Sequence, residues 1–290
     1  MAKNATTTKS PARNMSGEQF DLNLVCVTGP VIGVWGRNGD VFVRLQPPNL
    51  LPLSSPPSFV NVCIPNGMLD DVPVTLQKGD LLRVTGYVRQ TKFSESIRKI
   101  LTEAGKPEFI EENVPADDVK TWRKIRLSRR NAMMQAVAIE SLKEGHAQEN
   151  SIDLEGIITE VWTYKRDEGE DLFIRVAAYD ANTIETDQEG NFGRKKRIPH
   201  YINVLFPLGR PLSAPDDKKM FFRAKQRIRV RGELRDKWNT ETLHQLLFST
   251  GKPEIIGLLQ RVNNADELHQ MKTQLETLHV LANAAILYSR

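Results

Sequence analysis

Aromatic and arginine side chains recur at matched positions in two short segments of alternating apolar residues. The segment VFVRL places Phe42 and Arg44 between apolar residues. The segment LFIRV places Phe173 and Arg175 in the same way. Because successive residues of a strand point to opposite faces, each ring shares a face with an arginine, turned away from the apolar set. Rings and guanidinium groups on one face can stack on nucleobases and contact phosphate groups.

A second pair of segments adds an aromatic residue and an asparagine to each face. FVNVCIPNG carries Phe59 and Asn61 at the outward positions, and YINVLFPLG carries Tyr201 and Asn203 there. Exposed aromatic rings lower solubility unless they meet a partner, and a stacked base contributes about 1–3 kcal/mol. We therefore predict base stacking, with the alternative that loops or helices cover these rings as a secondary core.

Tryptophan and arginine residues near these faces are further candidates. Trp35 and Trp162 each follow the first strand of their half, where core capping and base stacking are both open. Four arginines of a later strand occupy matched positions in the two halves and are predicted to contact phosphates: Arg83, Arg89, Arg229 and Arg235. Solvated strands also carry arginine, so simple exposure is the alternative.

A long polar loop, residues 179–200, contains the run GRKKR. Its cationic side chains are predicted to contact nucleic acid rather than to form a nuclear-localisation signal, because the run lies inside a binding loop: Arg194, Lys195, Lys196 and Arg197. The corresponding loop of the first half, residues 46–58, has no positive charge. We therefore expect the second half of the chain to contact nucleic acid more tightly.

These matched positions belong to an internal duplication. Residues 79–110 align without a gap on residues 225–256, with 11 of the 32 positions identical. We interpret residues 22–144 and 150–290 as two copies of one module. Alternating apolar residues predict four or five short strands in each copy. Glycines inside the first and fourth strands suit the sharp coiling of a small barrel: Gly29, Gly86, Gly156 and Gly232.

The fourth strand carries a resemblance to a known family. LQKGDLLRVTGYVR, residues 76–89, is similar to the Lys-Gly-Asp strand of the bacterial-type single-stranded DNA-binding protein family, and RAKQRIRVRGELR, residues 223–235, is its counterpart. The resemblance implies a mainly β chain of two tandem OB-fold five-stranded barrels, each followed by an α-helix. It also implies a single-stranded nucleic acid as the ligand.

The expected organisation follows from these modules. We predict five segments in sequence order: a disordered basic arm over 1–20, a first OB fold over 21–112, a connecting helix over 113–149, a second OB fold over 150–258 and a C-terminal helix over 259–290.

Both helical predictions depend on local patterns. Residues 116–144 follow a proline and open with two aspartates, which favours a helix start. In the C-terminal segment, apolar residues spaced by three and four predict a helix that packs on another helix: Leu268, Met271, Leu275, Leu278, Ala282 and Ala285. This arrangement of a helix after a barrel resembles the replication protein A family, so we predict subunit association through the final helix. Packing on its own barrel or on the first helix is the alternative. The basic run over residues 120–130 is interpreted as a solvated face, with phosphate contact as the alternative.

Composition limits the other classes of function. The 290 residues are 40% hydrophobic and 26% charged, with a net charge of +4, which is typical of a globular protein with a mild basic excess. Cys26 and Cys63 lack metal-ligand spacing, and the five histidines are scattered. We therefore predict no enzyme activity, no metal and no cofactor. Because no segment approaches the length of a membrane span, we expect a cytoplasmic, nucleoid-associated protein.

The sequence thus favours sequence-tolerant binding and protection of single-stranded DNA in replication, recombination or repair. Two alternatives stay open. The barrels could dock proteins as an assembly module of a nucleoprotein complex, or the same faces could bind RNA.

Overall fold

The computed structural model describes most of the chain as two compact units. The described residues are 20–37, 39–48, 57–68, 76–143, 145–183, 185–187 and 195–288. One unit, here the ring unit, contains the described residues up to 89 together with 133–235 and 278–288. The other, here the helical unit, contains residues 90–132 and 236–277. The predicted basic arm, apart from Phe20, lies outside the described residues.

The first half of the ring unit is a closed set of five strands, here the first ring. Its strands are β1 (Asn23–Arg37), β2 (Asp40–Leu45), β3 (Val60–Ile64), β4 (Leu81–Ser96) and β5 (Arg126–Leu142). They neighbour one another in the order β1-β2-β3-β5-β4, and β1 pairs with β4 to close the ring. The β3–β5 pairing is parallel, whereas β1 pairs antiparallel with β2 and β4.

The second half repeats this arrangement as the second ring. Its strands are β6 (Asn150–Arg166), β7 (Gly169–Ala178), β10 (His200–Phe206), β11 (Arg227–Thr242) and β12 (Lys272–Leu287). Their order is β6-β7-β10-β12-β11, closed by the β11–β6 pairing. A short hairpin of β8 (Glu185–Asp187) and β9 (Lys195–Arg197) separates β7 from β10, and a 3-10 turn (Pro207–Gly209) follows β10. Antiparallel pairing of β1 with β6 joins the rings into one sheet.

This strand order is that of the OB fold, in which five strands form a small Greek-key barrel. The predicted fold class, a mainly β chain of OB type, is confirmed. The predicted alternation is also confirmed, because Val43 and Val62 are fully buried in the first ring, as are Ile174 and Ile202 in the second.

Glycine permits close backbone approach at one position in the fourth strand of each ring. A Cβ atom on Gly86 would lie 2.0 Å from the carbonyl oxygen of Gln135 on β5. A Cβ on Gly232 would lie 2.1 Å from the carbonyl oxygen of Leu281 on β12. A side chain at either position would force the strands apart, so glycine is needed for this close approach, whereas its role in sharp coiling stays a prediction.

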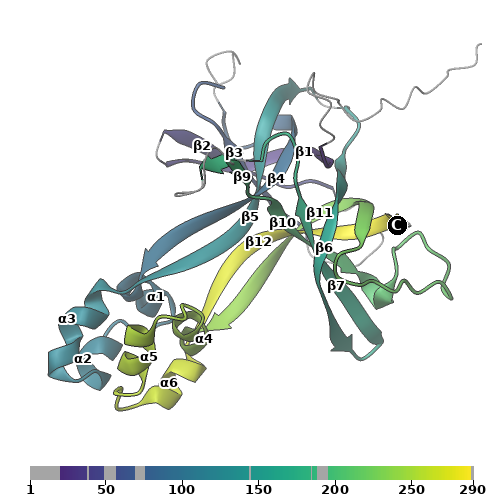
Figure 1. Cartoon of the computed structure of the whole chain (residues 1–290). Helices are drawn as coiled ribbons and strands as arrows, with labels where there is room; N and C mark the ends of the chain where they lie inside the picture. Colours follow the sequence, from purple (N-terminus) through teal and green to yellow (C-terminus); the bar gives the residue numbers. More distant parts are fainter. Residues whose placement is uncertain are drawn as a thin grey trace, which may run out of the picture. The chain divides into compact units, whose positions relative to one another are not determined.

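The helical unit is built from both copies of the module and has a single core. Its helices are α1 (Ile97–Glu103), α2 (Phe109–Asn113), α3 (Ala116–Lys124), α4 (Leu243–Phe248), α5 (Pro253–Leu259) and α6 (Ala265–Gln270), drawn in blue and yellow-green in Figure 1. Buried side chains from the two sets form one cluster around Trp122, Leu247 and Leu268. Within the described ranges, every helix is too short or too polar to traverse a lipid bilayer.

The predicted connecting helix is wrong beyond residue 124. The segment Arg126–Leu142 is strand β5, where Ala132, Met134 and Ala136 are buried at alternate positions. Closure of the ring supplies backbone partners along this segment, and such tertiary pairing overrides local helix preference. Along the chain, the helices instead follow the fourth strand of each ring and precede its fifth strand.

The predicted C-terminal helix is wrong for the same reason. Helix α6 ends at Gln270, and Lys272–Leu287 forms strand β12. Residues between the supposed seam positions, such as Val280 and Leu281, are also buried, so the spacing by three and four did not mark one apolar helix face. The seam residues divide between the helical core and the strand: Leu268 and Met271 in the core, and Leu275, Leu278, Ala282 and Ala285 on β12.

Candidate nucleic-acid interface

The first ring brings its predicted aromatic and arginine residues together on β1, β2 and β3. Trp35 and Phe42 are directly paired across β1 and β2, and their rings stack with centroids 5.7 Å apart and planes 11° apart. Trp35 is 42% exposed, and Phe42 is half-buried. This stacked pair presents an accessible ring to solvent on the paired strands β1 and β2.

A cation–π contact lies beside that pair. The guanidinium carbon of Arg44 is 4.7 Å from the centroid of the Phe59 ring, a geometry that orients the arginine. Arg44 is also directly opposite Asn61 in the β2–β3 register. The first ring therefore combines stacked rings, an arginine and an amide on one face, which we call the first face (Trp35, Phe42, Arg44, Phe59 and Asn61).

The second ring holds the equivalent residues in a related geometry, here the second face (Trp162, Phe173, Arg175, Tyr201 and Asn203). Trp162 and Phe173 stack with centroids 5.5 Å apart and planes 9° apart. Arg175 lies 5.7 Å from the Trp162 ring and donates a hydrogen bond of 3.1 Å from Nε to Asn203 Oδ1. The duplication thus preserves the aromatic pair and the arginine–asparagine pairing.

The second face differs from the first in what covers its ring. Phe173 is only 5% exposed and forms a cluster with Leu205 and Leu281, against which Trp162 and Leu212 pack. A backbone hydrogen bond of 3.1 Å from Leu212 N to Ala282 O fixes the covering segment. Phe173 is therefore part of a secondary core, as the alternative interpretation of these rings expected.

The arginine of the second face also has an acidic partner. Arg175 Nη1 lies 2.9 Å from the Glu160 carboxylate. The residue equivalent to Glu160 in the first ring is Gly33, which is opposite Arg44 in the β1–β2 register. The sequence interpretation overlooked this difference, although the aligned segments TGPVIGVW and EGIITEVW contain it.

The arginines of β4 are held by neighbouring side chains. Arg83 forms a 3.1 Å ion pair with Glu149 and a contact of 3.3 Å with Cys26 Sγ. Arg89 donates a 2.7 Å hydrogen bond to Gln135 Oε1. Neither side chain is part of the first face as defined by its contacts.

The arginines of β11 are paired with carboxylates. Arg229 binds Asp153 through Nε at 2.8 Å and Nη2 at 2.5 Å, and the buried Arg235 pairs with Glu233. Burial alone would raise the pKa of Asp153, but hydrogen bonds and charge from Arg229 and Arg231 lower it below its ordinary value. Such pairs reduce the positive charge that β11 offers to phosphates. The expectation of tighter binding by the second half therefore loses the support of its fourth strand.

The basic loop is only partly described. Arg194 lies outside the described residues, and Lys195 and Lys196 are described as backbone of β9. The guanidinium carbon of Arg197 is 4.8 Å from the centroid of the Phe20 ring. Contact of this loop with nucleic acid stays a prediction.

Metal chemistry has no candidate site in the described part of the chain, where no group of three or more His, Cys, Asp or Glu residues could hold an ion.

Comparisons with known proteins give a likeness of fold. No family model matches the chain, and no curated protein sequence matches it. Among solved structures, the single-stranded DNA binding protein from Thermus aquaticus superposes with a TM-score of 0.50 at 13% identity, covering 93% of this chain and 95% of that one. A deletion mutant of that protein gives a TM-score of 0.48 at 12% identity, covering 93% of this chain and 96% of that one. At these identities the likeness concerns the fold.

Proposed function

We propose that this chain binds single-stranded DNA with little sequence preference, chiefly through the first face. The observation that carries the proposal is the exposed stack of Trp35 on Phe42 beside Arg44. OB folds bind nucleic-acid strands across their second and third strands, where aromatic rings stack on bases and cations contact phosphates. The similarity of fold to a single-stranded DNA binding protein adds support, because that fold is compatible with the same ligand.

Each residue of the first face has a part in this proposal. The outer face of Trp35 stacks on a base, and Phe42 supports the ring from below. Arg44, held over Phe59, contacts a phosphate, and the Asn61 amide hydrogen-bonds a base edge or sugar. A stacked base contributes about 1–3 kcal/mol irrespective of its identity, so affinity arises without sequence readout.

The proposed role is passive. The chain covers and protects single strands during replication, recombination or repair, and we assign it no catalytic step. The second face, with its buried Phe173 and paired Arg175, contributes less to binding and more to the stability of the ring.

Fluorescence titration tests the function directly. We expect tryptophan emission to be quenched by oligothymidine, with much weaker binding to duplex of the same length. The logarithm of the binding constant should fall with the logarithm of salt concentration, by about 0.7 for each phosphate contacted. Absence of binding at low salt, or equal affinity for duplex, would contradict the proposal. An RNA oligonucleotide of the same length decides between DNA and RNA as the preferred ligand.

Substitution of the stacked pair tests the site. W35A together with F42A should weaken oligothymidine binding by about tenfold or more, since at least one stacking contact is lost. The matched control is Y164A, which removes a 63% exposed aromatic ring from β6 in the second ring. Unfolding by denaturant should confirm that all variants are folded. An affinity equal to that of the wild type in the double variant would remove the first face from the site.

A further inference from the structure

The helical unit contains a cavity that the proposed binding face does not use. Its volume is about 630 Å³. It is lined by the parts of β4, β5, β11 and β12 that belong to the helical unit and by residues in and just after α4. The side chains that line it come from both copies of the module: Lys92, Arg126, Ser128, Arg129, Arg130, Asn239, Glu241, Leu246, Ser249, Thr250, Lys252 and Leu275. Five of them are cationic, and one is a carboxylate.

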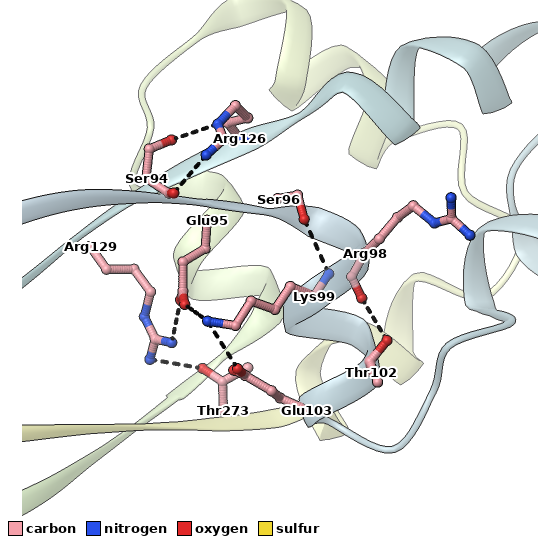
Figure 2. A network of polar contacts seen from close by, with 10 residues as sticks. All are labelled: Ser94, Glu95, Ser96, Arg98, Lys99, Thr102, Glu103, Arg126, Arg129 and Thr273. Atoms are coloured by element: carbon pink, nitrogen blue, oxygen red, sulfur yellow. Dashed lines mark hydrogen bonds and ion pairs between the residues drawn. The ribbon is translucent and has the colours of Figure 1, made fainter. Parts of the chain in front are cut away.

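Two of the five arginine and lysine residues are fixed in place by hydrogen bonds. Figure 2 shows Arg126 bound to Ser94 through Nε to the hydroxyl, at 3.1 Å, and through Nη2 to the backbone carbonyl, at 2.8 Å. Both acceptors are neutral, so they orient the guanidinium without cancelling its charge. Arg129 is different, because it pairs with Glu95 at 3.2 Å and donates to Thr273 at 3.3 Å.

The other three cations of the cavity are exposed. Lys92, Arg130 and Lys252 have no carboxylate partner among the residues that the structure describes. Like charges that share a cavity repel one another, so an unneutralised set costs stability unless an anion occupies it. Ser128 and Asn239 add neutral groups that can donate hydrogen bonds to an anion.

Comparison with the other copy shows that the scaffold does not require positive charge at two of the four positions, those of Lys92 and Arg130. The two copies keep a constant offset of 146 residues through the helices. Ile97 N donates a hydrogen bond to Ile125 O in the first copy, and Leu243 N donates the equivalent bond to Met271 O in the second. At that offset Arg130 corresponds to Glu276, and Lys92 corresponds to Trp238. The equivalents of these two cations are therefore acidic or apolar, whereas Lys252 and Arg126 correspond to Lys106 and Lys272, which keep the positive charge.

The network on that opposite side is balanced. Lys99 bridges Glu95 and Glu103 at 2.5 Å and 3.5 Å, as Figure 2 shows, and Lys106 pairs with Glu267 at 2.7 Å. Lys99 and Lys106 on this side are thus paired with carboxylates, whereas Lys92, Arg130 and Lys252 form no ion pair among the described residues.

We infer that this cavity binds phosphate groups. Four cations form no ion pair among the described residues, against the single lining carboxylate of Glu241, and neutral hydrogen-bond donors line the same cavity. This combination matches the charge and the acceptor oxygens of phosphates. Phe248 directly precedes the lining residue Ser249, and its ring is 58% exposed and stacks on His244. The other side of that ring offers a stacking surface for a base. The phosphates are therefore those of a nucleic-acid strand, and this assignment of their source rests on the proposed function. We expect this second contact to add to the affinity only for strands longer than one ring binds.

The first arm of the test compares two oligonucleotide lengths. The variant R130Q with K252Q removes two cations from the cavity. The control K106Q with K272Q removes two cations from the equivalent positions of Lys252 and Arg126 on the opposite side. An oligothymidine of about 12 nucleotides lies within the site size of one OB fold, whereas one of about 40 nucleotides exceeds it.

We expect the cavity variant to bind the longer strand about tenfold more weakly than the control, with the shorter strand unaffected. For the longer strand, the slope of the logarithm of the binding constant against the logarithm of salt concentration should be smaller by about 1.4 in the cavity variant, because two phosphate contacts at about 0.7 each are lost. The variant R130K keeps the positive charge at this position and should retain most of the wild-type affinity for the longer strand. If the wild type binds single strands but the cavity variant and the control behave alike, the inference is overturned and the proposed function stands.

The second arm uses inorganic pyrophosphate in place of a strand. We expect it to raise the unfolding temperature of the wild type and of the control, but not that of the cavity variant. If oligonucleotides fail to bind and pyrophosphate binds in this pattern, the proposed function fails, while the phosphate site stands with a small phosphate compound as its ligand. If neither probe distinguishes the cavity variant from the control, the site does not exist.

Discussion

The first and second faces share a plan and differ in access. Each has a cross-strand tryptophan–phenylalanine stack and an arginine opposite an asparagine. In the first face Phe42 is opposite Cys63, whereas in the second face Phe173 is opposite Leu205, which joins Leu281 and Leu212 to cover the ring. One apolar neighbour and a fixed loop convert a surface ring into a core residue.

Charge follows the same division. Arg44 contacts an aromatic ring and faces a glycine across the sheet, but Arg175 is paired with Glu160. A carboxylate in hydrogen-bonding range of a guanidinium competes with an incoming phosphate. At this position across the sheet the first face therefore has a glycine where the second has a carboxylate, which supports the proposed binding of an anionic ligand at the first face.

The largest effect that separates the faces concerns stability. F173A should lower the free energy of unfolding by about 3–5 kcal/mol, because it removes a buried aromatic side chain from a packed cluster. F42A, at the equivalent half-buried position, should cost clearly less. Denaturant unfolding of both variants measures the difference. Equal losses would mean that the two rings are equally part of the core.

The next effect is obtained by giving the first face the charge pattern of the second. G33E places a carboxylate opposite Arg44, and the position has room, since the nearest atom to a Cβ there is Arg44 Cβ at 3.9 Å. We expect about fivefold weaker oligothymidine binding and a salt dependence smaller by about 0.7, the value for one phosphate contact. G33Q has the same shape without the charge and serves as the control. Should both variants bind equally, the glycine would matter for shape and not for charge.

The sequence predicts the scaffold of this comparison but not its outcome. The inward and outward positions of Val43, Phe42 and their equivalents follow from a period of two, and Gly86 and Gly232 follow from the repeat. Such patterns are local or are doubled by the duplication, so they can be read without knowing what lies nearby.

What the sequence could not predict depends on distant partners. Residues 126–142 and 272–287 resemble helices locally and become strands because each closes a ring. The cover over Phe173 comes from Leu212, 39 positions away in the chain, and no periodicity reports such a contact. The merging of two helical segments into one core likewise arises from packing between the copies.

The reverse exchange should have a smaller effect. E160Q releases Arg175 from its acidic partner, and we expect a gain in oligothymidine affinity of about twofold, because exposed ion pairs contribute only about 0–1 kcal/mol. The buried Phe173 still denies the face a stacking surface, which limits the gain. A titration of E160Q against wild type at low salt measures it. A gain as large as the loss in G33E would show that charge alone separates the two faces.

The smallest effect concerns acid stability and again differs between the rings. His200 on β10 is buried beside Asp180, Arg89 and the Tyr87 ring, whereas its equivalent in the first ring is Ser58. Burial lowers the pKa of His200, and the Arg89 charge adds to that effect, while Asp180 and a backbone hydrogen bond with Asn182 oppose it.

The folded state of His200 therefore binds protons more weakly than the unfolded state, whose pKa is about 6.5. The contribution of His200 to the free energy of unfolding is complete above that pH, and this free energy should decline as the pH falls below it. We expect the midpoint of urea unfolding to fall modestly between pH 7.5 and pH 5.5 in the wild type and to fall less in H200Q. H146Q, which replaces an exposed histidine, should retain the wild-type dependence. If H200Q and H146Q have the same pH dependence, another group accounts for the acid sensitivity of the second ring.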